Sequence, residues 1–178
     1  CSRMAARKRR TLRFARHGAA GVLTLDRAEK RNALSDRLVE ELEAFLAAPP
    51  AGLRALVLNG AGEHFCAGLD LAELADRSAA EGVAHSRFWH RAFDRLQFGT
   101  LPVVAVLHGA VVGGGLELAA AAHVRVAETS VFYAFPEGQR GIFLGGGGSV
   151  RVPRLIGAHR VADMMFTGRV LSAEEGQA

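Results

Sequence analysis

Cysteine is scarce in this chain, and its scarcity excludes one class of fold. Only two cysteines occur, Cys1 and Cys66, and one of them is the first residue. Small secreted domains that depend on disulfides carry a dense, paired set of cysteines. With 178 residues the chain is long enough to bury an apolar core instead. We expect one domain, held together by that core, in a reducing compartment.

Residues spaced as metal ligands are also missing. His85 and His90 lie five positions apart, so they do not share one face of a helix. His64 and Cys66 together would supply only two ligands, whereas a structural zinc ion takes four. The sequence therefore predicts no metal site.

A long apolar run is absent too. The longest weakly polar stretch, residues 101–122, is interrupted by His108 and Glu117. A membrane-spanning helix needs about 18 or more apolar residues in succession. The net charge of +4 is modest. We therefore expect no membrane insertion, and the charge alone is not a sign of nucleic-acid binding.

Short apolar runs alternate with amphipathic segments along the chain. This alternation predicts an α/β fold. Ser35 is a predicted N-cap, and Ser172 with Glu175 forms a predicted capping box. The predicted strands are residues 11–16, 21–26, 53–59, 102–107, 124–127 and 131–133, and the predicted helices are 35–48, 70–77, 83–98, 114–122 and 159–166.

Two glutamates and two glycine-rich turns carry the chemistry. Three glycines at 113–115 are followed by Leu116 and then by Glu117, and Glu137 comes 20 residues after Glu117. Two carboxylates can share proton transfers around one water or one C–H bond. The turns at 65–70 and 113–115 can present bare backbone N–H groups to one oxygen. Together these parts could polarise a carbonyl and move protons beside it.

Structural roles for the same residues stay open at this point. Glu117 could simply complement the dipole of the helix it begins. Glu137 could be a solvated loop residue, and the glycines at 145–148 could be flexible turn material. The apolar run at 118–122 predicts a buried helix, however, and a buried glutamate needs a partner or a function. Cys66 has no neighbouring base in the sequence and is interpreted as a packing residue.

Several blocks together resemble the enoyl-CoA hydratase/isomerase superfamily, the crotonases. Three of them carry the main motifs: DRAEKRNAL at 26–34, FCAGLD at 65–70 and HGAVVGGGLEL at 108–118. The segment from FPE at 135–137 to GGS at 147–149 matches in spacing, as does FTGR at 166–169. The resemblance runs from about residue 11 to the last residue.

The resemblance implies a crotonase (ClpP-like) spiral of repeated ββα units. It implies that the backbone N–H groups of Ala67 and Gly114 form an oxyanion hole for a CoA thioester carbonyl. It also implies that Ala67, Gly68, Leu69, Asp70 and Gly114 bind the substrate or its CoA. Glu117 and Glu137 fall on the two catalytic glutamates of the hydratases in this family.

The chain departs from the family pattern at three internal positions. Ala28 and Leu144 stand where proline is common, and His123 stands where aspartate is common. Leu144 is expected near the acyl pocket and leaves the choice of substrate open. Family members usually continue into a C-terminal helical region that completes the acyl pocket and the trimer interface. We expect that this region is absent from the sequence, and that a homotrimer or hexamer forms where it is present.

Residues 1–10 form a basic N-terminal tail before the crotonase core at 11–178. Residues 1–16 hold seven basic residues and no acid. The tail can be a solvated segment, the remnant of a transit peptide, or a patch that binds the phosphates of nucleic acid or CoA. We expect a cytoplasmic protein, with the mitochondrial matrix as the alternative.

The resemblance implies an enoyl-CoA hydratase, a hydro-lyase that adds water to a 2-enoyl-CoA thioester and forms a 3-hydroxyacyl-CoA. The acyl-CoA is the expected partner, and no cofactor is expected apart from the CoA of the substrate. A Δ3,Δ2-enoyl-CoA isomerase or another CoA-thioester crotonase is the nearest alternative. A non-catalytic, RNA-binding homologue is a further alternative, which would not require both glutamates.

Overall fold

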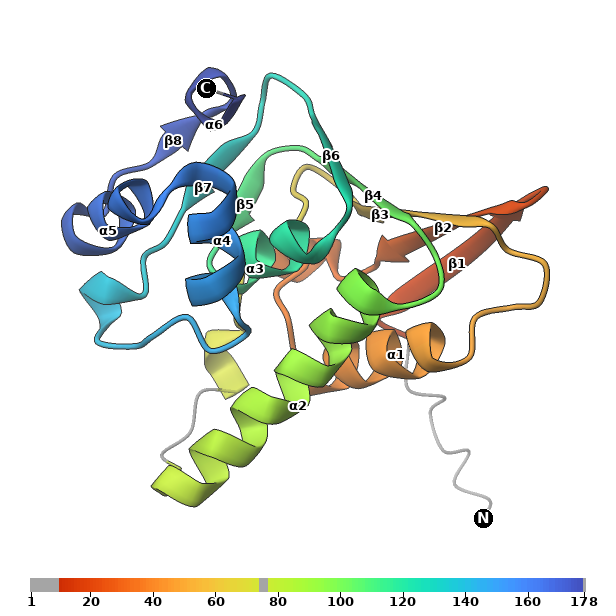
Figure 1. Ribbon diagram of the computed structural model, residues 1–178, viewed down its shortest axis with the longest axis horizontal. Helices are drawn as coiled ribbons and strands as arrows, with labels where there is room; N and C mark the ends of the chain where they lie inside the picture. The colour runs from red at the N-terminus through yellow and green to blue at the C-terminus, as the bar shows by residue number, and fades with distance from the viewer. Residues whose placement is uncertain (1–9, 74–76, 178) are drawn as a thin grey trace, which may run out of the picture.

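The computed structural model describes residues 10–73 and 77–177, and its larger sheet has five strands. The strand order is β1-β2-β3-β4-β6 (Figure 1). The first two strands form the predicted hairpin and pair antiparallel, and the remaining neighbours pair parallel. The strands are β1 (Leu12–His17), β2 (Ala20–Leu25), β3 (Ala55–Gly60), β4 (Val103–Leu107) and β6 (Val124–Ala127).

A smaller sheet contains three short strands in the order β5-β7-β8. They are β5 (Ala110–Val112), β7 (Phe132–Ala134) and β8 (Leu171–Ser172). Cys66 makes an isolated parallel bridge to Val111 and so extends the pairing of β5 by one residue. The sequence predicted neither β5 nor β8, because both are shorter than the span over which an alternating pattern can be recognised.

The helices of the described residues cover the two sheets. The α-helices are α1 (Asp36–Ala47), α2 (Ala79–Phe98), α3 (Gly114–Ala121), α4 (Gly148–Ile156), α5 (Ala158–Thr167) and α6 (Ala173–Gln177). Single 3-10 turns are η1 (Ala28–Lys30), η2 (Leu71–Glu73) and η3 (Gly138–Arg140). None of the helices in the described segments has the length and apolar character needed to cross a membrane.

The chain passes between the two sheets in a repeated order. β4 in the larger sheet leads to β5 in the smaller one and then to α3, and β6 leads in the same way to β7 and α4. β3 leads to the bridge at Cys66 and then to α2. Each repeat is a ββα unit, so the structure confirms the predicted α/β spiral.

Local signals explain where the helices begin. The Ser35 hydroxyl accepts a hydrogen bond from the Leu38 N–H at 3.2 Å, which confirms the predicted N-cap. Ser172 and Glu175 bond each other's backbone N–H groups and confirm the second predicted cap. α2 begins at Ala79, earlier than predicted, because Ser78 and Glu81 form a capping box that was not predicted.

Two further elements differ from the prediction, and one predicted segment lies almost wholly outside the described residues. The helix predicted over 70–77 is only the 3-10 turn Leu71–Glu73, with residues 74–76 outside the described part and Arg77 not helical. α4 was not predicted, since its N-cap is Gly147 and it contains Pro153, both unusual signals for a helix. The predicted basic tail lies outside the described residues except for its last position, Arg10.

The core lies between the larger sheet, α1, α2 and α3. Leu23, Leu58 and Phe93 are among its fully buried side chains. All eight residues of α3 are buried, which confirms that this helix is internal. A functional group on α3 is therefore held in the packed interior, away from solvent.

Candidate active site

The N-terminus of α3 carries the first candidate acid. Its N-cap, Gly113, has a φ of 54°, in the left-handed region that glycine adopts without strain. Glu117 follows in the first turn and is only 3% exposed. The dipole of the helix stabilises negative charge at this end. The local structure therefore places a carboxylate inside the molecule and partly compensates its charge.

One oxygen of Glu117 is bound by the loop that precedes α4. Oε1 accepts hydrogen bonds from the backbone N–H of Gly146 at 3.0 Å and of Gly148 at 2.8 Å. A Cβ at Gly148 would lie 2.5 Å from Cγ of Glu117, which real Cβ atoms do not approach. The glycines at 145–148 are thus a fitted binding element for this acid and not only flexible turn material.

Glu137 is the second candidate acid, and its surroundings differ. It is 8% exposed, and its Oε2 has no hydrogen-bond partner among the described residues. A Cβ at Gly113 would lie 2.3 Å from its Oε1, so the glycine at the start of α3 makes room for the carboxylate. Buried polar atoms are nearly always hydrogen-bonded, and a catalytic role is one explanation for an unpartnered one. Glu137 therefore presents a free oxygen beside the N-terminus of α3.

The two carboxyl groups have different electrostatic environments. Burial raises the pKa of Glu117, while the N–H donors of Gly148 and Gly146 and the charge of Arg151 oppose that rise. Burial raises the pKa of Glu137 to about 7, and repulsion from Glu117 adds to the rise. Because only Glu117 has two N–H donors on one oxygen, it is the better carboxylate of the two. Glu137 is suited to carry a proton near neutral pH.

Two backbone N–H groups near these acids are available to a ligand. Among the hydrogen bonds of the described residues, none is donated by the backbone N–H of Leu69 or of Gly114. The two positions are close, since a Cβ on Gly114 would lie 3.6 Å from the backbone nitrogen of Leu69. Together they form a candidate site for one oxygen that gains negative charge.

This arrangement corrects the donor predicted at Ala67. The Ala67 N–H donates to the carbonyl oxygen of Arg31 at 3.0 Å and is therefore already used inside the fold. The N–H of Leu69, two residues later, has no such partner among the described residues. We therefore replace Ala67 by Leu69 as the candidate donor and retain Gly114.

The acids and the two candidate donors share one cavity. It has a volume of about 200 Å³. Its lining residues are Leu69, Arg77, Gly82, His85, Ser86, Trp89, Gly114, Glu117, Glu137, Ile142, Phe143, Gly145 and Gly146. A larger cavity, of about 540 Å³, borders α3 at Leu116 and Ala120 but includes neither glutamate. Because the smaller cavity holds both acids, it is the candidate active site.

The predicted binding loop at 67–70 contributes to this site unequally. Ala67 and Gly68 line a small cavity of about 20 Å³ that, like the candidate active site, is bordered by Leu69 and Glu137. Asp70 lines neither cavity, and its carboxylate accepts a hydrogen bond from the Arg27 guanidinium at 2.7 Å. That contact lowers the pKa of Asp70. Asp70 therefore anchors the loop, and the structure gives no contact of its side chain with the candidate site.

Arg151 supports Glu117 from behind. Its buried guanidinium donates to the carbonyl oxygen of Gly146 at 2.9 Å and to Gln97 Oε1 at 2.7 Å, and it pairs with Asp94. The N–H of the same Gly146 binds Glu117. Arg151 thus ties the glycine loop to α2 and fixes the donors of the acid. The sequence offered no signal for this contact, because Arg151 lies inside the unpredicted helix α4.

The positions that depart from the family pattern lie outside the cavity. Leu144 was expected near the acyl pocket, and its neighbours Phe143 and Gly145 line the candidate site, while its own side chain is buried in the core and is not part of the lining. The His123 Nδ1 accepts the Val103 N–H at 3.0 Å.

Burial raises the pKa of Cys66 to about 12, in keeping with its interpretation as a packing residue. Over residues 10–73 and 77–177, no three potential ligands of the His, Cys, Asp or Glu type gather into a metal site.

Known proteins resemble this chain in both sequence and structure. Residues 16–178 match the sequence profile of the family described as enoyl-CoA hydratase/isomerase. A crystal structure from Rhodopseudomonas palustris, which carries an enoyl-CoA hydratase assignment, superimposes with a TM-score of 0.91 at 58% identity. That alignment covers 93% of this chain and 64% of the other.

Two curated relatives extend the comparison. The fatty acid oxidation complex subunit alpha of Shewanella baltica is 38% identical over 90% of this chain and 24% of its own length. An enoyl-CoA isomerase/hydratase of Mycosarcoma maydis is 35% identical over 87% of this chain and 61% of its own. This chain therefore spans less than two thirds of the length of these two curated relatives.

Proposed function

We propose that this chain, which belongs to the enoyl-CoA hydratase/isomerase family, adds water to 2-enoyl-CoA thioesters and forms 3-hydroxyacyl-CoA. One observation carries the proposal. Two buried carboxyl groups and two unused backbone N–H groups line the same cavity. An isomerase needs one acid to move a proton between two carbons of the acyl chain, whereas hydration benefits from two acids with different protonation states.

The thioester oxygen would accept hydrogen bonds from the N–H groups of Leu69 and Gly114. As water adds at C3, negative charge develops on this oxygen, and these bonds strengthen. The loss of one such donor costs about 2.7–4 kcal/mol of transition-state stabilisation in comparable sites. Because the donors belong to the backbone, they need no side-chain reorganisation during the reaction.

The two acids would divide the proton transfers. The carboxylate of Glu117 takes one proton from the water, whose oxygen forms the new bond to C3. The electron pair of the C2–C3 double bond moves toward the thioester carbonyl, and protonated Glu137 then delivers a proton to C2. Exchange with solvent returns a proton from Glu117 to Glu137. Every atom comes from substrate, water or these two acids, so this scheme requires no metal or redox cofactor.

The arrangement of pKa values supports this division. The pKa of Glu137, raised to about 7, keeps much of this acid protonated at neutral pH. The two N–H donors on Glu117 favour its charged form relative to a buried carboxyl group without them. The general acid and the general base are therefore assigned by their surroundings and not only by their positions in the sequence.

The test is turnover of a panel of 2-enoyl-CoA thioesters with identification of the product. A 3-hydroxyacyl-CoA would support hydration. A shifted double bond without incorporation of water would instead support the Δ3,Δ2-isomerase, a reaction compatible with the name of the Mycosarcoma maydis relative. If neither product forms with any thioester, the proposal of an enzyme acting on 2-enoyl-CoA is wrong.

A further inference from the structure

The wall of the candidate cavity that α2 provides is polar. His85 and Trp89 line the cavity, and both bond the same carboxylate oxygen of Asp36, at the start of α1. His85 Nε2 lies 2.6 Å from Asp36 Oδ1, and Trp89 Nε1 donates to that oxygen at 3.2 Å. The guanidinium of Arg77 lies 3.9 Å from the other oxygen. This cluster is separate from the two glutamates but opens into the same space.

His85 keeps one ring nitrogen free. Its Nε2 faces a carboxylate, so Nε2 carries the proton. Its Nδ1 makes no hydrogen bond within the described part of the chain. The ring is also packed against Trp89, with centroids 5.8 Å apart, and the side chain is 23% exposed. Asp36 and Trp89 therefore fix the ring in one orientation and leave one nitrogen available.

The α2 wall lies where the acyl tail of the substrate would run. If the carbonyl lies at Leu69 and Gly114, the reacting carbons lie beside Glu117 and Glu137. The parts of the cavity that remain are the α2 face and the loop at 142–146. The acyl group beyond C3 must run along them. Ile142 and Phe143 in the loop are apolar, whereas the α2 face adds the polar side chains of His85 and Ser86. A plain fatty acyl tail would not need polar side chains on that face.

We propose that His85 recognises a hydroxyl group on the acyl chain, and that the preferred substrates are hydroxylated 2-enoyl-CoA thioesters. This proposal rests on the proposed function, since it takes the cavity as the site of the acyl half of a CoA thioester. His85 is the specificity residue, and Asp36 and Trp89 position its ring.

A hydroxyl fits this wall better than a carboxylate or a methyl group does. A hydroxyl can donate to the lone pair of Nδ1 in the neutral ring and can accept from Nδ1–H in the charged ring. A carboxylate could pair with the charged ring or with Arg77, but it would enter a cavity that already holds two acids with Asp36 behind the wall. A methyl group would displace water from Nδ1 without replacing its hydrogen bond. Of these three groups, the hydroxyl is the one that can bond Nδ1 in both the neutral and the charged ring.

The experiment measures binding and does not depend on catalysis. Calorimetry would compare saturated acyl-CoA thioesters that end in a hydroxyl with partners of equal length that end in a methyl, over a series of chain lengths. We expect the best hydroxylated thioester to bind about threefold to tenfold tighter than its methyl partner, the usual value of one hydrogen bond. In His85→Leu this ratio should fall to about one, and His85→Gln should retain part of it.

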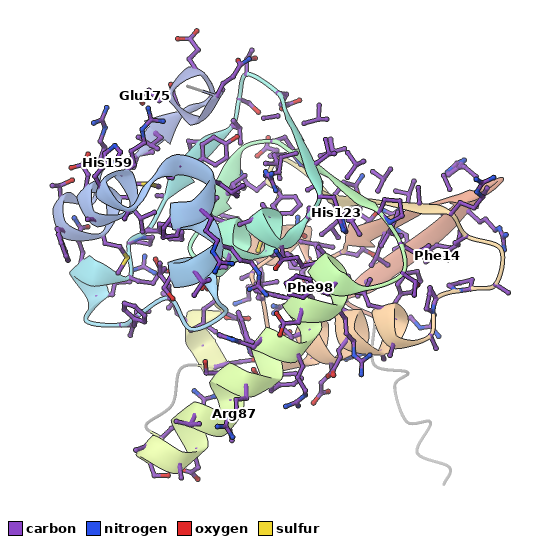
Figure 2. All side chains as sticks on the ribbon, in the orientation of Figure 1. Phe14, Arg87, Phe98, His123, His159 and Glu175 are labelled. Carbon is purple, nitrogen blue, oxygen red and sulfur yellow. The ribbon has the colours of Figure 1, made fainter. Side chains whose placement is uncertain are left out.

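Arg87 offers a matched control. It is exposed on α2 two positions from His85, and it does not line the cavity (Figure 2). Arg87→Leu should leave the ratio unchanged. Equal binding of both thioesters by the wild type at every length would overturn the proposal, as would a preference that survives in His85→Leu. A failure of the proposed function would look different: no thioester would be hydrated, whereas the binding ratio would still be measurable.

Discussion

Two regions of this molecule bury polar groups, and they treat them in opposite ways. At Asn32, both polar atoms of the side chain are paired: Oδ1 accepts the Arg27 N–H, and Nδ2 donates to the carbonyls of Ala61 and His64. Around Glu137, one carboxylate oxygen has no partner within the described residues, and another acid lies near enough to raise its pKa. Both regions are buried, so burial alone does not identify a site.

The difference shows which buried polar groups serve the fold and which serve chemistry. A fully bonded group stabilises one conformation and has no capacity left for a ligand. An unpaired group costs stability in the resting protein and keeps capacity to bond a substrate or a transition state. The region of Glu137 therefore has the character of an active site, and the region of Asn32 has that of a scaffold.

The largest effect should come from the acids themselves. Glu117→Gln and Glu137→Gln should each lower kcat by about 10²–10⁴-fold, because each removes one proton transfer. The measurement is steady-state turnover of the best 2-enoyl-CoA, with the fold checked by circular dichroism. Near-wild-type kcat in either variant would mean that the two-acid mechanism is wrong.

The pH dependence sharpens the same prediction. A general acid must be protonated, and the pKa of Glu137 is raised to about 7. The wild-type kcat/KM should therefore fall as the pH rises through about 7. The residual activity of Glu137→Gln should lack this limb, since glutamine does not titrate.

The next effect concerns the backbone donors. Replacing Leu69 by the corresponding α-hydroxy acid removes its N–H and keeps its side chain, and it should lower kcat by about 10²–10³-fold. The same replacement at Ala67 removes the bond to Arg31 and should cost about 1 kcal/mol of stability with little loss of turnover. Equal losses of kcat at the two positions would contradict the assignment of Leu69.

A smaller effect is expected from Arg151, which acts through the glycine loop. Arg151→Met should lower kcat about tenfold with little change in KM, because the loop that orients Glu117 loses its support. The loss of a nearby positive charge should also move the Glu117 limb of the pH profile to higher pH. Arg151→Lys should restore part of the activity. A variant with low kcat but an unshifted pH profile would indicate a purely structural role.

The smallest effect is on stability, which a substitution in one region should raise and a substitution in the other region should lower. The folded pKa of Glu137 is raised, so its ionisation costs stability as the pH rises from about 4.5 to about 7. At about pH 8, Glu137→Gln removes this cost and should raise Tm by about 2–4 °C, which is about 1 kcal/mol for a chain of this size. Asn32→Ala should lower Tm by at least as much, since it leaves buried partners unpaired. A fall in Tm for both variants would remove the distinction between the regions.

Local patterns in the sequence were enough for the frame of the fold. The hairpin, the parallel strands β3 and β4 and the caps at Ser35 and Ser172 were predicted, because each depends on residues close in the chain. The helix α4 was missed because its glycine cap and Pro153 oppose a helix locally. Its packing against α3 and the buried contacts of Arg151 outweigh those local preferences.

The site was harder to predict, for a related reason. The motifs indicated Glu117, Glu137 and Gly114, and the structure brings these three to one cavity. The choice between Ala67 and Leu69 depends on which N–H is already bonded, and that is decided by the carbonyl of Arg31 in a distant segment. His85 and Asp36 are 49 positions apart, and no local signal joins them. Contacts between remote segments are the part of the site that the motifs did not contain.

The position of the glycine loop in the chain also sets the earliest point during synthesis at which Glu117 can acquire its donors. The Gly148 N–H is 31 residues later in the chain than the carboxylate it stabilises. At about 5–20 residues per second, the ribosome needs roughly 2–6 s to make that interval. Until then Glu117 lacks its two N–H donors, so we expect α3 to become stable only after the glycine loop has been synthesised. Pulsed hydrogen exchange on nascent chains would show this as joint, late protection of α3 and the loop, and early protection of α3 alone would contradict it.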